Sequence, residues 1–163
     1  KGILYFQLKH PEYRYLIGPV SISNRFSDFS RSLMIEYISQ HYFDNELAKY
    51  VMPRNPFIPD TGDVDVEILL EESRDIGKFD KHIRDVDIED VGMPVLLKKY
   101  LSINGKIVAF NLDANFNDAL DGLLVLDLMK VPMTMITSLS KEINDASILE
   151  RFNHSSVSDI GRT

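Results

Sequence analysis

Hydrophobic and polar positions divide the chain into short runs with either strand-like or helix-like spacing. Two runs near the start, Ile3–Leu8 and Tyr15–Ser23, are rich in β-branched and aromatic residues, which is typical of strands. We expect them to pair antiparallel across a turn at residues 10–12. The Gly18-Pro19 pair in the second run indicates a bulge, or a point where the strand leaves its neighbour.

The segment after the second strand run has hydrophobic residues at helical spacing. A helix is predicted from about Phe29 to Tyr42, with Ser27 and Asp28 as candidate N-caps. Asp44 can cap a further short helix that ends before Pro53, because proline disfavours a helical residue before it. The apolar face of the longer helix is formed by residues at helical spacing, namely Leu33, Met34, Tyr37, Ile38 and His41.

The second half begins with a helix that Pro94 opens and that Gly105 follows as the C′ residue. Strands are predicted over Lys106–Leu112 and Gly122–Met129, and their continuously apolar runs predict cover on both faces. Helices from Pro132 to Ile143 and over 146–152 complete the chain. The apolar face of the Pro94 helix comprises Val95, Leu96, Leu97, Tyr100 and Leu101.

Composition adds an uneven charge. The chain has 163 residues, 44% of them hydrophobic, and a net charge of −7, which fits a single domain over residues 1–163. Residues 60–90 hold 12 of the 25 acidic residues but only 4 of the 18 basic ones. We therefore expect an acidic, solvated helical insertion at about 53–92. Its two short helices are predicted over Val64–Glu72, where a strand is the alternative, and Lys78–Arg84.

Several functional classes are disfavoured by what the sequence lacks. There is no cysteine, which excludes disulfides, thiolate metal sites and a cysteine nucleophile. No basic face suggests nucleic acid, and no glycine-rich phosphate loop of the common kinds occurs. The four histidines share no metal spacing, so no metal site is predicted. With no apolar run of membrane-spanning length, we expect a cytoplasmic protein whose membrane contact is peripheral, at the inner face.

Two segments resemble a known family. The order Pro94, Leu96, Lys98, Tyr100, Leu101, Lys106, Asp113, Phe116, Asn117 is similar to that of the bacterial ornithine-lipid-type N-acyltransferases, some of which are labelled hemolysins. Upstream, Leu16-Ile17-Gly18, a short polar loop and a helix resemble the acyl-donor strand and helix of the same family. The two matches span about residues 15–42 and 92–128.

The resemblance implies the α/β fold of the acyl-CoA N-acyltransferase (GNAT) superfamily, a mixed sheet flanked by helices, here without part of its N-terminal half. Two parallel strands of that fold splay apart, and the donor's pantetheine lies in the gap. The gap would lie between Leu16–Ser23 and the strand after the Pro94 helix, with the donor phosphate at the turn 24–32. The donor-binding residues would be Ile17, Gly18, Val20, Ile22, Arg25, Arg31 and Ser32.

The same resemblance suggests an acceptor side. Asp113, Asn117 and Asp118 are the predicted catalytic or substrate-binding residues; the alternative is that Asp113 and Asn115 only cap their loop. Phe116 is expected in the core. Lys98 and Lys99 are candidates for docking a carrier protein, against the alternative of a solvated helix face. Asp127 stands in an apolar strand, so it should lie at a strand end or pair with a lysine.

The predicted function is an N-acyltransferase that moves a fatty acyl group from an acyl-carrier-protein or CoA thioester to an amino-acid amine, for membrane aminolipid synthesis. The thioester is a co-substrate, and no bound cofactor is expected. Two departures from the family keep an alternative open: Pro19-Val20 replaces an Arg-Ser pair, and the 24–32 turn lacks glycine. The alternative is a non-catalytic, degenerate module of this fold that binds lipid or a partner domain.

Overall fold

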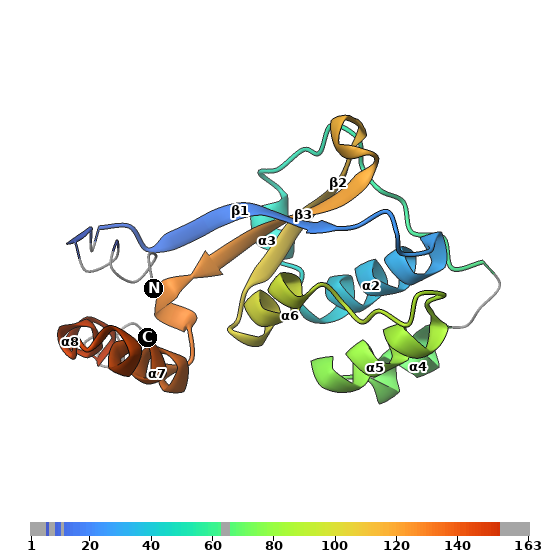
Figure 1. Cartoon of the computed structure of the whole chain (residues 1–163). Coiled ribbons are helices and arrows are strands. Elements are labelled where there is room, and N and C mark those ends of the chain that lie inside the picture. Colours follow the sequence, from blue (N-terminus) through green and yellow to red (C-terminus); the bar gives the residue numbers. More distant parts are fainter. Residues whose placement is uncertain (1–5, 7–8, 11, 63–65, 154–163) are drawn as a thin grey trace, which may run out of the picture. The chain divides into compact units, whose positions relative to one another are not determined.

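The chain adopts a mixed α/β structure in a computed structural model that describes residues 6, 9, 10, 12–62 and 66–153 (Figure 1). It divides into two compact units. The sheet unit comprises residues 17–125, and the terminal unit comprises residues 1–16 and 126–163. The first strand run, Ile3–Leu8, lies largely outside the described residues, but the strand prediction is wrong at Phe6, which is helical and whose carbonyl accepts from the His10 amide at 2.9 Å.

Three strands form one sheet in the order β1-β3-β2. They are β1 (Tyr15–Ile22), β2 (Lys106–Asp113) and β3 (Ala119–Asp127). The hairpin of β2 and β3 is antiparallel, from Lys106↔Val125 to Asp113↔Ala119, with an irregularity at 107–109. The arrows of Figure 1 show β1 also running antiparallel to β3.

This strand order corrects one expectation. We predicted a gap between β1 and the strand after the Pro94 helix, which is β2. Instead β3 lies between them and hydrogen-bonds to both. The reason is the short β2–β3 connection, which folds β3 back beside β2 and lets β1 pair on its other side.

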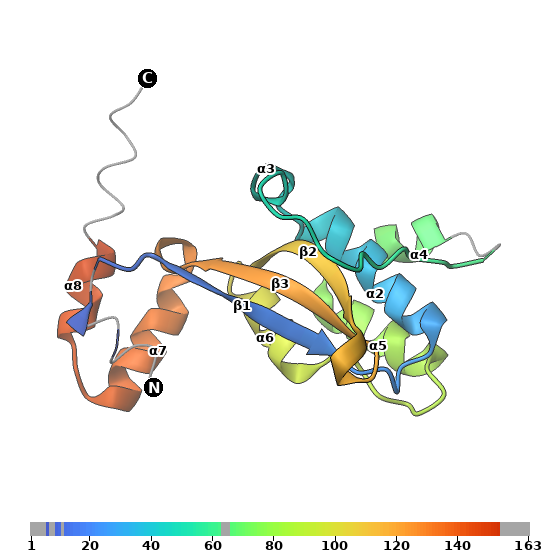
Figure 2. The same ribbon diagram turned by 90° about the horizontal axis from the view of Figure 1, so that it is seen from above.

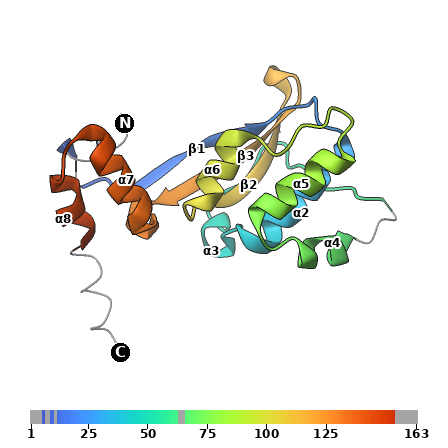
Figure 3. The ribbon, with the colours of Figure 1, turned by 60° about the horizontal axis from the view of Figure 1, so that its bottom comes forward.

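Helices cover one face of this sheet. Figure 1 shows α2, α5 and α6 below the strands, and Figure 3 shows the same helices in front of them from below. The prediction that β2 and β3 are covered on both faces is nevertheless confirmed for part of each strand, because the consecutive residues 107–110 and 124–126 are buried. The helices of the sheet unit are α2 (Asp28–His41), α3 (Asn45–Ala48), α4 (Val66–Glu72), α5 (Ile76–Val86) and α6 (Val95–Ser102).

The helix N-caps that the sequence predicts for α2 and α3 are confirmed. Ser27 caps α2 by accepting a hydrogen bond from the Ser30 amide, and Asp44 caps α3 through the amides of residues 46 and 47. At the end of α6, however, the left-handed residue is Asn104 (φ 69°), not Gly105. The Gly105 amide donates to the Tyr100 carbonyl at 2.9 Å, and a Cβ on Gly105 would lie 2.7 Å from that oxygen. Asn104 is therefore the C′ residue, and Gly105 follows it as C″. Glycine is needed at Gly105 for the close approach to the Tyr100 carbonyl rather than for a left-handed φ.

The apolar face predicted for α6 is only half correct. Leu97 and Leu101 are buried, whereas Val95 and Leu96 are 74% and 65% exposed. The reason is that α6 meets the core along a narrow stripe, so neighbours one position away point outward.

Residues 60–90, which we call the acidic segment, contribute to the core of the sheet unit. Tyr37 of α2 is fully buried and stacks on Phe79 of α5, with ring centroids 3.8 Å apart and planes 5° from parallel. Burial raises the pKa of Tyr37, whose hydroxyl donates to the Arg74 carbonyl at 3.4 Å. Ile83 of α5 is also fully buried. One face of this segment is thus core, and its charges lie on the other faces.

The terminal unit has its own ion pair. Asp127 ends β3 and accepts two hydrogen bonds from Arg14, at 2.8 and 2.7 Å. These bonds hold the pKa of Asp127 below its ordinary value, against the opposing effect of burial. The partner is thus an arginine rather than the predicted lysine, and the strand-end position is confirmed. Helices α7 (Met133–Ile143) and α8 (Ser147–Asn153) pack on each other.

Removing the Phe79 ring tests whether the acidic segment is part of the folded core. Phe79→Ala should lower the free energy of unfolding by about 3 kcal/mol or more, because it empties a buried site and removes the Tyr37 stack. Ile88→Ala, at a 92% exposed position in the same segment, should change it by less than about 0.5 kcal/mol. Urea unfolding would measure both, and equal small losses would place the segment outside the core.

Candidate functional site

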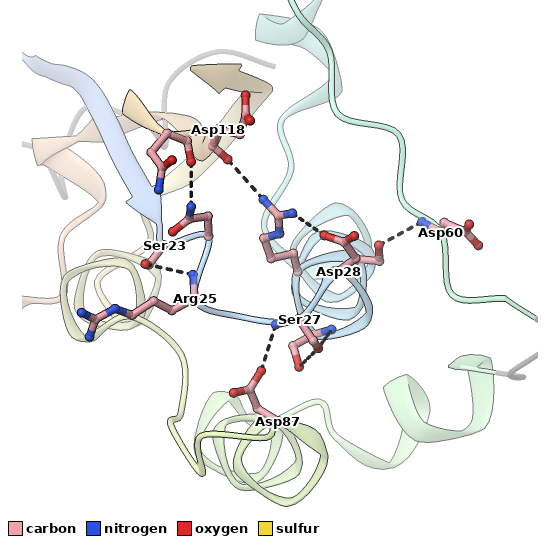
Figure 4. A network of polar contacts seen from close by, with 12 residues as sticks. Ser23, Arg25, Ser27, Asp28, Asp60, Asp87 and Asp118 are labelled. Carbon is pink, nitrogen blue, oxygen red and sulfur yellow. Dashed lines mark hydrogen bonds and ion pairs between the residues drawn. The ribbon is translucent and has the colours of Figure 1, made fainter. Parts of the chain in front are cut away.

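Two segments distant in sequence meet at one end of the sheet. The Asn24 side-chain amide donates to the Asn117 carbonyl at 2.9 Å, and Arg31 Nη1 donates to the Asp118 carbonyl at 3.2 Å. Figure 4 shows these contacts, which join the β1–α2 loop and the first turn of α2 to the β2–β3 turn. We call Asn24, Arg31, Asn117 and Asp118 the polar cluster. It joins one predicted donor-binding residue, Arg31, to two predicted catalytic residues.

The β2–β3 turn has a constrained backbone. Asp113 accepts a hydrogen bond from the Asn115 amide at 2.9 Å and so caps a short 3-10 helix, residues 114–116. Asn117 and Asp118 follow with φ of 55° and 53°, which short polar side chains tolerate best. Asp113 therefore has the capping role, which leaves its second carboxylate oxygen for another partner. Phe116 was expected in the core, but it is 75% exposed because this turn projects from the sheet.

The start of α2 was the expected phosphate site, and the protein's own carboxylates lie there. Asp87 accepts a hydrogen bond from the Ser27 amide at 3.3 Å, and the Ser27 side chain accepts from the Ser30 amide. Asp28 in the first turn pairs with Arg31. Since a helix N-terminus attracts negative charge, these groups satisfy it internally. An incoming phosphate would have to displace Asp87 or bind beside it.

The other predicted donor-binding residues divide into buried and exposed ones. Val20 and Ile22 are buried in the core, and Ser32 is buried with its hydroxyl accepting from the Asp60 amide at 2.9 Å. Ile17 is 66% exposed, and Gly18 beside it has open space where a Cβ would stand. Arg25 is exposed, and Figure 4 shows it pointing away from the polar cluster.

An additional polar pair lies on the sheet. The Ser21 hydroxyl of β1 donates to Asp121 of β3 at 2.5 Å. Sequence reasoning missed this pair because the two residues are 100 positions apart and neither stands in a motif. Alternation along β1 puts Ser21 on the same face as Ile17, away from the buried Val20 and Ile22. A carboxylate is thus held on the face that the helices of this unit leave open.

Lys98, one of the two predicted docking residues, is engaged inside the sheet unit. Its ammonium lies 2.7 Å from Asp80, which also accepts from Arg84 at 3.1 Å. Burial alone would raise the pKa of Asp80, but these two hydrogen bonds outweigh it and hold the pKa below its ordinary value. A Cβ on Gly92 would lie 2.4 Å from the Asp80 carboxylate and 2.8 Å from the Arg84 guanidinium, so a larger residue there would have to displace this ion pair. Only Lys99 remains exposed for docking.

Metal and pocket geometry add no further candidate. Among the described residues, no three His, Asp or Glu side chains gather as a metal site. His41 lies edge-on to Tyr37, and burial lowers its pKa, which favours a neutral structural imidazole. A depression of about 430 Å³ between α2 and α4 is lined by Glu36, Ser39, Gln40, Val66, Glu67 and Leu70, none of them a predicted site residue. Within the described ranges no helix is long and apolar enough to cross a bilayer.

The Asp80 ion pairs predict a pH dependence. Because the folded pKa lies below the unfolded value, the stabilisation is present above pH ~4 and is lost as the pH falls through the folded pKa. Asp80→Asn should therefore lower the free energy of unfolding at pH 7 by about 1–3 kcal/mol, with a smaller difference at about pH 3. Asp85→Asn, at an exposed position of α5, is the matched control for urea unfolding at both pH values. Equal effects of the two substitutions would refute the assignment.

Comparison of the chain with protein-family models, with curated proteins and with solved structures finds no match.

Proposed function

We propose that this chain is part of an N-acyltransferase of the acyl-CoA N-acyltransferase (GNAT) fold, which moves a fatty acyl group from a carrier-protein or CoA thioester to an amino-acid amine. The resemblance of residues 15–42 and 92–128 to the ornithine-lipid-type enzymes supplies the chemistry. The observation that carries the proposal is the position of β1. It is an edge strand, with β3 on one side and no strand paired to its outer edge within the described part of the chain.

An acyl thioester on a pantetheine arm is an extended molecule with two amide groups. A free strand edge offers alternating N–H and C=O groups that can pair with such amides, as in strand addition. Along β1, the exposed Ile17 and the small Gly18 would allow the arm to approach the backbone closely. Pro19 donates no N–H, which restricts pairing to the residues on either side.

The donor phosphate would meet limited positive charge. Asp87 and Asp28 already occupy the start of α2, whereas Arg25 is exposed beside it and has no ion pair among the described residues. A single phosphodiester needs fewer contacts than the pyrophosphate of CoA. These charges therefore favour a carrier-protein thioester over CoA as the donor.

Transfer requires a neutral amine. The amine nitrogen attacks the thioester carbonyl carbon, the carbon–sulfur bond breaks, and the thiolate leaves and takes up a proton. A carboxylate within reach of the amine can accept the proton that the nitrogen loses. The candidate carboxylates are those of Asp121, which Ser21 of β1 holds, and of Asp118 in the polar cluster. Asp113 and Asn117, in the same turn, would orient the acceptor.

A second candidate function is supported by the charges at the start of α2. A domain whose helix N-terminus is filled by its own carboxylates has lost an anion site that a donor would use. On this observation the chain is a non-catalytic module of the same fold that binds lipid or a partner domain. The two candidates differ in one measurable result, the formation of an N-acyl product.

Gly18→Val tests the position of the donor. Because nothing lies within 4 Å of a Cβ at Gly18, valine should fit and leave the free energy of unfolding within about 0.5 kcal/mol of the original. The added isopropyl group would block the approach of a pantetheine arm to β1. We expect at least about a tenfold loss of kcat/KM with a long-chain acyl-carrier-protein thioester and the acceptor amine, measured by mass spectrometry of the N-acyl product.

Ser138→Val, at an exposed position of α7, is the matched control for adding an apolar branched side chain. If the original protein forms no N-acyl product with any of the twenty amino acids or with ornithine, the enzymatic proposal fails and the non-catalytic module stands. If product forms but Gly18→Val is fully active, the donor does not lie along β1.

A further inference from the structure

Large apolar side chains are exposed together in the segment that follows α2. We call residues 45–58 the α3 loop; it comprises α3 and the irregular connector after it. Tyr50 is 87% exposed, Met52 94% and Ile58 82%, and Leu47 is partly exposed. Single exposed apolar residues are ordinary, but four within twelve positions are costly to leave in water without a partner.

The fold holds this loop in place at both of its ends. At one end, the Asp44 amide donates to the Ile107 carbonyl, and the Ile107 amide donates to the Tyr42 carbonyl, both at 2.9 Å. At the other end, the Leu112 amide donates to the Asn55 carbonyl at 2.8 Å. Figure 2 shows α3 and the connector on the β2 side of the sheet. Tyr50 and Met52 thus project from a backbone that is fixed on the outer edge of β2.

The charge of the loop differs from that of the rest of the chain. No acidic residue lies between Glu46 and Asp60, in a chain with a net charge of −7. Arg54 is exposed and has no ion pair among the described residues. Lys106, at the start of β2, lies beside the base of the loop, with its ammonium 3.3 Å from the His41 carbonyl. The apolar side chains are therefore accompanied by basic ones.

We propose that the α3 loop is a docking surface for an anionic phospholipid bilayer. Met52 and Ile58 enter the boundary between headgroups and acyl chains, and the Tyr50 ring lies at the level of the headgroups. Arg54 contacts the lipid phosphates. A partner protein with an acidic groove is the competing occupant. The bilayer is favoured because the exposed apolar side chains project from a loop that also carries the exposed Arg54. This inference is independent of acyl transfer.

The test measures the binding of the protein to phospholipid vesicles by flotation, without thioester or amine. Vesicles of phosphatidylcholine alone are compared with vesicles that contain phosphatidylglycerol. We expect binding to the anionic vesicles that weakens on adding about 0.5 M NaCl, because surface charges are screened. Met52→Asp should lower the partition coefficient at least about tenfold, and Arg54→Glu about fivefold.

Ile88→Asp is the matched control, since Ile88 is 92% exposed on the segment between α5 and α6. It makes the same apolar-to-acidic change outside the α3 loop and should leave vesicle binding unchanged. Failure of the original protein to bind anionic vesicles overturns the proposal, as does an equal loss in Ile88→Asp. Self-association in sedimentation that Met52→Asp abolishes, without vesicle binding, would assign the loop to a second copy of the chain instead.

Discussion

The architecture of the sheet unit depends on β3, because both backbone edges of that strand are hydrogen-bonded, to β1 on one side and to β2 on the other. This central position brings the loop after β1 to the turn between β2 and β3, where Asn24 and Arg31 bind the carbonyls of Asn117 and Asp118. It also makes β1 and β2 the two edge strands. The outer edge of β2 is occupied by residues 42–44 and 55–56, and that of β1 has no strand partner among the described residues. The two surfaces to which we assign functions follow from this difference.

The acidic segment shows how a highly charged stretch can still belong to a core. Only a few of its side chains face inward, but Phe79 and Ile83 are fully buried, and Phe79 stacks on Tyr37. Its charges also serve the fold. Asp80 engages Lys98 and Arg84, and Asp87 binds the amide at the start of α2. The segment therefore provides the carboxylates that neutralise groups which the resemblance would otherwise assign to ligands.

Because of this neutralisation, two observations bear on the proposed function in opposite directions. Edge-strand geometry at β1 suits an extended acyl donor, whereas the start of α2 is already satisfied by Asp87 and Asp28. A donor with one phosphodiester, met by Arg25 at the surface, is compatible with both observations. Charge also distinguishes the α3 loop, since that loop combines exposed apolar residues with Arg54, which has no ion pair among the described residues.

Local chemistry was readable from the sequence because it depends on neighbouring residues. The caps at Ser27 and Asp44, the turn between β2 and β3, and the hairpin strands all follow from spacing and side-chain type. Features that involve distant residues were not readable. The pairing of Ser21 with Asp121, the capture of Lys98 by Asp80 and the exposure of Phe116 each depend on which strand lies beside which. The sequence by itself determined where helices and strands form, through short-range periodicity and capping. Only the tertiary structure decided which edges are paired, which charges are neutralised and which apolar side chains stay in water, because these depend on contacts between residues far apart along the chain.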